Sequence, residues 1–144
     1  MKILLVFVAL LSVSASPKVT QKHLDSVVKY WQGVLSLQDW EIRAHTVRLV
    51  DLDEGTLGVS RRDPNFRVMQ IGVLDPRDYA EAVVSMGLVS KTDKEIRRDI
   101  DDTILHEIVH LRLRELVQAD VNEIGDAEEV TVNRITSALE RAKR

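Results

Sequence analysis

The chain has 144 residues, a formal net charge of −3 and no cysteine. A chain of this length can bury the core of one domain but not of two. The lack of cysteine excludes disulfides and thiolate metal sites, and the mixed, slightly acidic charge without a basic block argues against nucleic acid as a partner.

The N-terminus has the pattern of a secretory signal peptide. Met1-Lys2 is a short positive start, followed by an apolar run at 3–11 and a small polar stretch at 12–16. Val13 and Ala15 suit the small-residue positions of a signal-peptidase site, so cleavage is expected after Ala15. The apolar run is much shorter than the ~20 residues of a spanning helix. The pattern therefore predicts a secreted or periplasmic protein without a stable membrane anchor: residues 1–15 as the signal peptide and 16–144 as a single domain.

The next part of the chain is predicted to form a helix and three strands. Apolar residues at helical spacing predict a helix from about Thr20 to Leu35. The alternation that begins at Trp40 predicts a half-buried strand. Segments 56–61 and 66–74 are predicted to be two strands of a hairpin, joined by an Arg-Asp-Pro-Asn turn.

Two further helices follow the strands. Asp75-Pro76 offers an N-cap followed by proline, which predicts a short helix that ends at Gly87. Thr92 and Glu95 have the spacing of a capping box, and a long helix is expected from there to about Val117.

The C-terminal part of the chain is predicted to be a polar loop and a last helix. QADVNEIG breaks the long helix, and Asp126 is expected to cap a helix that runs through Leu139. The resulting order of elements predicts one α+β domain.

The predicted long helix carries the motif HEIVH at 106–110. Residues four apart on a helix lie about 40° apart around its axis, so His106 and His110 can direct both imidazoles at one point. Zinc accepts imidazole nitrogen and carboxylate oxygen, and a catalytic site uses three protein ligands. Glu107, one step around the helix, can reach a water at the metal without being a ligand, and can act as general base. The apolar residues around the motif argue against a freely solvated histidine pair.

A third zinc ligand has to come from another part of the chain. No histidine follows His110, and His23 and His45 have the surroundings of surface histidines. The last helix begins with Glu128 and Glu129, either of which can complete a site of two histidines and one carboxylate. Geometry alone leaves this choice open, and three acidic residues in or beside the preceding loop are further candidates: Asp120, Glu123 and Asp126. Glu129 also fits a capping box with Asp126, which is a purely structural reading of the same residue.

HEIVH, followed after eighteen residues by Glu129 in EEVTVNR, resembles the gluzincin class of zinc metallopeptidases. The short chain is similar to the minigluzincins and to related small bacterial and phage-encoded metallopeptidases. In that group a helix, a small antiparallel three-stranded sheet, the HExxH helix and a glutamate helix form a minimal zincin-like catalytic unit. LSLQDWEI and IGVLDP also resemble segments of that group.

The resemblance implies a zinc ion (Zn2+) held by His106, His110 and Glu129, with Glu107 as general base. It thereby favours Glu129 over Glu128. Asn133, four residues after Glu129, matches a position that supports the ligands, where it is expected to bond the distal nitrogen of a ligand histidine. Peptidases of the class also have a tyrosine or histidine that stabilises the oxyanion. The sequence assigns none, although Tyr79 lies in a segment that can overhang the site.

Three functions remain open from the sequence. The leading prediction is an exported zinc-dependent endopeptidase, whose peptide or protein substrate lies along an edge strand, expected at 66–74. The second is a zinc-binding regulatory or interaction domain with weak or no catalysis. The third is a structural α+β interaction domain in which HEIVH is coincidental.

Overall fold

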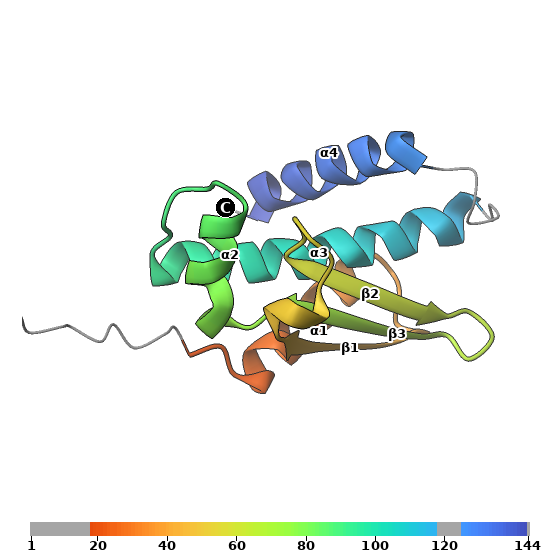
Figure 1. The fold of residues 1–144 in the computed structure, drawn as a ribbon. Helices are drawn as coiled ribbons and strands as arrows, with labels where there is room; N and C mark the ends of the chain where they lie inside the picture. Colours follow the sequence, from red (N-terminus) through yellow and green to blue (C-terminus); the bar gives the residue numbers. More distant parts are fainter. Residues whose placement is uncertain (1–17, 118–124, 144) are drawn as a thin grey trace, which may run out of the picture.

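The computed structural model describes residues 18–117 and 125–143, which form α-helices and one small sheet (Figure 1). The elements follow in the order α1 (Gln21–Val34), β1 (Glu41–Val47), η1 (Leu49–Asp51), β2 (Gly58–Asp63), β3 (Val68–Leu74), η2 (Pro76–Asp78), α2 (Tyr79–Ser85), α3 (Asp93–Val117) and α4 (Gly125–Lys143). The predicted α+β class is confirmed. The signal peptide expected at 1–15 and the loop candidates Asp120 and Glu123 lie outside the described residues.

The sheet is mixed, with the strand order β1-β3-β2. β2 and β3 form the expected antiparallel hairpin, whereas β1 runs parallel to β3, with Glu41 opposite Val68 and Val47 opposite Leu74. The expectation of an antiparallel sheet, and of segment 66–74 at its edge, is therefore wrong. β3 is almost entirely buried while β2 alternates between half-buried and exposed residues. A continuous apolar run such as that of β3 belongs in the centre of a sheet, because both its neighbours and its covered face exclude water.

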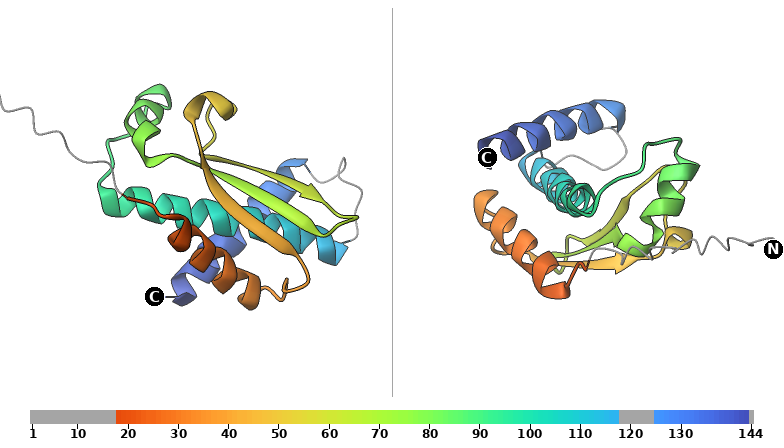
Figure 2. Two further views of the ribbon diagram at one scale, coloured as in Figure 1. Left: turned by 90° about the horizontal axis from the view of Figure 1, so that it is seen from below. Right: turned by 90° about the vertical axis from the view of Figure 1, so that its left-hand side faces the viewer.

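One hydrophobic core joins the sheet to the helices. α1 and α3 lie on the same face of the sheet, and α4 packs on the far side of α3 (Figure 2). α3 is therefore covered by the sheet on one side and by α4 on the other. Its fully buried residues form the centre of the core: Ile100, Ile104, Leu105, Ile108, Val109 and Leu111. Among the helices of the described ranges, none is long and apolar enough to cross a membrane.

The predicted helix ends agree closely with the structure. The Thr20 side chain accepts a hydrogen bond from the third backbone N–H beyond it, as an N-cap does. Thr92 and Glu95 form both halves of the capping box, with a Thr92 N–H to Glu95 distance of 2.7 Å. Gly87 ends the α2 region with a φ of +65°, a conformation that favours glycine. α4 runs one turn beyond the predicted end, to Lys143, and the side chain of its expected cap, Asp126, is outside the described set.

A buried carboxylate ties the start of α2 to the end of β1. Asp78 accepts two hydrogen bonds from the Arg48 guanidinium, at 2.7 and 2.8 Å, and one from the Leu49 backbone N–H at 2.9 Å. The bonds from Arg48 and then from Leu49 hold the pKa of Asp78 below its ordinary value, against the opposing effect of burial. These three hydrogen bonds to Asp78 hold the start of α2 against the segment that follows β1.

Candidate metal centre

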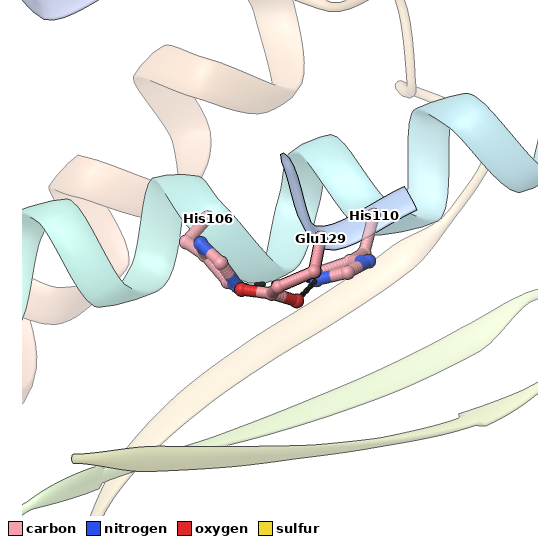
Figure 3. Close-up of side chains that lie close together, drawn as sticks. All are labelled: His106, His110 and Glu129. Carbon is pink, nitrogen blue, oxygen red and sulfur yellow. Dashed lines mark hydrogen bonds and ion pairs between the residues drawn. The ribbon is translucent and has the colours of Figure 1, made fainter. Parts of the chain in front are cut away.

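The two histidines of HEIVH and one glutamate of α4 converge on a single point (Figure 3). The Nε2 atoms of His106 and His110 are 3.1 Å apart. Glu129 places one oxygen 3.3 Å from His106 Nε2 and the other 3.1 Å from His110 Nε2. The three side chains come from two helices that run antiparallel, so the packing of α4 on α3 creates the cluster.

The donor set and its dimensions fit zinc. With zinc–nitrogen and zinc–oxygen bonds of about 2.0–2.1 Å, two ligands of a tetrahedral ion are about 3.3–3.4 Å apart. In the cluster the two ring nitrogens are 3.1 Å apart, and Glu129 approaches them with different carboxylate oxygens, at 3.3 and 3.1 Å. Taken with one ligand atom per residue, the three groups lie within 4.8 Å of one another, so an ion can be accommodated once the side chains adjust. His106 and His110 are half-buried, and Glu129 is 52% exposed at its side chain. The cluster is therefore open to solvent on the side of Glu129, where a catalytic zinc site needs access for water and substrate.

Glu128 lies behind the cluster and supports His110. Its side chain is 6% exposed, and its carboxylate lies 2.7 Å from His110 Nδ1 and 2.9 Å from Arg114 Nε. A neutral imidazole that donates from Nδ1 presents its Nε2 lone pair to the metal point, which is the usual arrangement of a ligand histidine. Burial acts to raise the pKa of Glu128, but the bonds from His110 and Arg114 outweigh it and hold the pKa below the ordinary value. The two neighbouring glutamates thus contact opposite sides of His110. Glu129 lies at its Nε2 atom, within the cluster, and Glu128 lies at its Nδ1 atom, outside the cluster.

Asn133 supports the cluster in a way that differs from the expected one. Its side-chain nitrogen donates to Glu129 Oε1 at 3.3 Å, one turn away on the same helix, and not to a histidine. The expectation that Asn133 bonds a ligand histidine is therefore wrong, because Glu128 occupies that position at His110. The Asn133 bond restrains Glu129, which is otherwise an exposed side chain with several rotamers.

Glu107 faces the same cleft and is held by a residue that sequence reasoning missed. The hydroxyl of Ser60, on β2, donates to Glu107 Oε2 in a short hydrogen bond. β2 approaches α3 closely at this point, and a Cβ on Gly58 would lie 2.4 Å from the Thr103 side chain. Strand alternation places Gly58 and Ser60 on the face toward α3, but only the packing of strand on helix brings Ser60 to Glu107.

The cluster opens into a cleft of about 750 Å3 between α3, α4 and the segment that leads into β2. The lining includes Glu107 and the three clustered residues, and then continues along α3 and α4 through Thr103, Asp102, Asp99, Thr136, Ser137 and Glu140.

Tyr79 does not reach this cleft. It is 2% exposed in the core, and its hydroxyl has no hydrogen-bond partner within the described part of the chain. Burial, and then the nearby Asp99 carboxylate, raise its pKa far above the ordinary value. The suggestion that Tyr79 stabilises an oxyanion at the site is therefore wrong. Within the described residues, neither a tyrosine nor a histidine other than His106 and His110 lines the cleft.

The remaining histidines lie elsewhere, as predicted. His23 contacts Asp101 at 2.7 Å on the other side of α3, and His45 is exposed on the uncovered face of the sheet. Both lie apart from the cluster.

Comparison of the chain with models of known protein families, with curated proteins and with solved structures gives no match.

Proposed function

We propose that the chain is an exported zinc-dependent endopeptidase. The observation that carries the proposal is the convergence of His106, His110 and Glu129 beside Glu107 in one open cleft. A coincidental HEIVH motif would not require a carboxylate from a separate helix at the same point, nor a buried glutamate behind one of its histidines. Export through the N-terminal segment belongs to the proposal on the sequence pattern alone.

The residues of the cleft divide the proposed chemistry between them. Zinc, when bound, acts as a Lewis acid that makes water a nucleophile near neutral pH and polarises a peptide carbonyl. Glu107 accepts the proton of the attacking water and delivers it to the leaving amine. The Ser60 hydroxyl engages one carboxylate oxygen of Glu107 and leaves the other for that proton. Glu128 and Asn133 hold His110 and Glu129 in place.

The edge of β2 offers a binding site for the substrate main chain. The Leu57 carbonyl accepts from the Leu74 N–H, so by the alternation of an antiparallel ladder Gly58 and Ser60 direct their own backbone groups to the outer edge. A peptide that pairs with this edge lies in an extended conformation next to α3 and Glu107. We therefore propose the edge of β2 as the site for the substrate main chain, since segment 66–74 forms the central strand of the sheet.

A second candidate function is zinc binding without useful catalysis. The observation that favours it is the absence of a tyrosine or further histidine from the described lining of the cleft. Loss of one oxyanion donor costs an acyl-transfer enzyme about 2.7–4 kcal/mol of transition-state stabilisation. A regulatory or interaction domain would keep the metal centre and do without this donor.

Two measurements on the same samples separate these functions. The parent chain and the Glu107→Gln variant are analysed for zinc, and their cleavage of a randomised peptide library is followed by mass spectrometry. The proposal predicts one zinc per chain in both and cleavage by the parent alone. Zinc in both without cleavage by either would favour the second function, and cleavage that persists in Glu107→Gln would contradict the role of Glu107.

A further inference from the structure

Arg62 lies on the face of β2 that is turned toward α3. Side chains alternate along a strand, so Arg62 shares this face with Gly58 and Ser60. A Cβ on Gly58 would meet Thr103, and Ser60 bonds Glu107. β2 and α3 therefore run side by side in the same direction (Figure 1). Arg62 is the next residue on this face, about 7 Å along the strand beyond Ser60.

The guanidinium of Arg62 is half-buried and has no partner within the described residues, where it forms neither a hydrogen bond nor an ion pair. Burial, and then the like charge of Arg114, lower the pKa of Arg62 below its ordinary value, while Glu128 and Glu115 act in the opposite direction. The Arg62 nitrogens keep some contact with solvent, since none of them is among the fully buried unpaired atoms of the described chain. A ligand can therefore reach this cation.

The carboxylates nearest in charge to Arg62 are bonded to other arginines. Glu128 accepts a hydrogen bond from Arg114 at 2.9 Å, and Glu115 accepts one from Arg67 at 2.9 Å. These two pairs leave the positive charge of Arg62 without a counter-charge in direct contact in the described part of the chain. A partly desolvated cation in this state favours an anion from outside the chain, because charge-assisted hydrogen bonds replace the water that it has lost.

The edge of β2 brings a substrate side chain to Arg62. Arg62, like Ser60, directs its backbone N–H and carbonyl to the outer edge of the sheet, because the residues that alternate with them bond to β3. Residues directly opposite each other in an antiparallel pair have side chains on the same face, with Cβ atoms about 4.5–5.5 Å apart. The substrate residue opposite Arg62 is two residues away from the one opposite Ser60, which lies at Glu107. Its side chain therefore lies next to Arg62.

From these contacts we infer that Arg62 is a specificity-determining residue, which binds a carboxylate of the peptide substrate about two residues from the scissile bond. The carboxylate accepts two parallel hydrogen bonds from the guanidinium, the geometry for which arginine is suited. It belongs either to an aspartate or glutamate side chain or to the end of the peptide chain. This inference rests on the proposed peptidase function and adds a substrate feature to it.

Three hexapeptides that differ in one carboxylate test this inference. The first has one glutamate among alanines and both ends blocked, the second has glutamine in its place, and the third has the same glutamine and a free C-terminal carboxylate. Each is titrated into the 15N-labelled, zinc-loaded full chain with Glu107→Gln, which prevents cleavage, and the amide shifts of β2 are followed by NMR. The glutamate peptide, or the peptide with the free end, should bind at least about fivefold more tightly than the blocked glutamine peptide, as expected for hydrogen bonds to a charged group.

Two variants and one matched control separate binding from a structural role. Arg62→Gln should lose the preference for a carboxylate, and Arg62→Lys should keep part of it, because the charge remains without the planar fork of donors. The control is Arg61→Gln, which removes the same charge from an exposed side chain on the opposite face of β2 and should keep the preference. The melting temperature of Arg62→Gln should be unchanged or raised, since an unpaired cation is removed.

The inference would be overturned if neither carboxylate improved binding, or if Arg62→Gln kept the preference. A lower melting temperature together with lost preference in both Arg62 variants would assign a purely structural role to Arg62 and would overturn it as well. Zinc content and cleavage of the randomised peptide library by the chain with Glu107 intact are measured in parallel. A carboxylate preference without cleavage would show that the peptidase function fails while the binding role of Arg62 holds, so the two failures are distinguishable.

Discussion

Replacement of Glu128 by glutamine should weaken zinc binding without abolishing it. The carboxylate is buried and bonds His110 Nδ1 at 2.7 Å and Arg114 Nε at 2.9 Å. A glutamine amide retains one acceptor oxygen but loses the charge, so His110 keeps its place with a weaker bond. Loss of such a partner typically costs about 10- to 100-fold in metal affinity, which corresponds to about 1.4–2.7 kcal/mol.

Competition against a chromophoric chelator measures this affinity. Glu129→Gln, which removes a ligand, should lose stoichiometric zinc under the same conditions. Glu115→Gln is the matched control, because this glutamate forms an ion pair with Arg67 away from the cluster, and it should bind zinc as the parent does. The separate roles of the two glutamates would be refuted if Glu128→Gln bound zinc as tightly as the parent, or if it lost zinc as completely as Glu129→Gln. Either result would mean that Glu129 is not the ligand with Glu128 as its support.

Three further variants test other parts of the structure. Ser60→Ala should retain zinc but lower kcat about ten- to hundredfold, because Glu107 loses its restraint; unchanged kcat would contradict a positioning role. Gly58→Ala should destabilise the chain by about 1–3 kcal/mol in denaturant unfolding, since its Cβ would lie 2.4 Å from the Thr103 side chain. Asp78→Asn should cost about 1 kcal/mol at neutral pH. Because the pKa of Asp78 is lowered in the folded chain, its stabilisation is present above the unfolded carboxyl pKa and is lost as pH falls through the folded value. The melting temperatures of parent and Asp78→Asn should therefore converge in acid.

Much of the fold follows from local signals. The capping pair of Thr92 and Glu95, the proline after Asp75 and the glycine after α2 each act within a few residues, and each is found where the sequence places it. The order of the strands in the sheet is not set by such local signals. It depends on which strand is best buried on all sides, and the apolar run of β3 takes the central position, between β1 and β2.

In the candidate site too, some residues follow from local spacing and others depend on how the elements pack. His106, Glu107 and His110 share one helix, so their spacing alone brings them to one face. Glu128 and Glu129 are about 100° apart on α4, and only the rotation of α4 against α3 decides which of them meets the histidines. Sequence spacing could not supply that rotation, which is set by packing around residues such as Val132. Ser60 was missed for a related reason, since its contact with Glu107 depends on how closely β2 approaches α3.

Zinc content of the purified full chain is the most direct test of the metal centre. Elemental analysis should find one zinc per chain in the parent and in the His23→Ala and His45→Ala controls, and little in His106→Ala or His110→Ala. A chelator should also lower the melting temperature of the parent, since a ligand that binds only the folded chain stabilises it by about 2.7 kcal/mol at a hundredfold excess over its dissociation constant. A parent chain without zinc, whose melting temperature a chelator leaves unchanged, would contradict the account and make HEIVH a coincidental motif in an interaction domain.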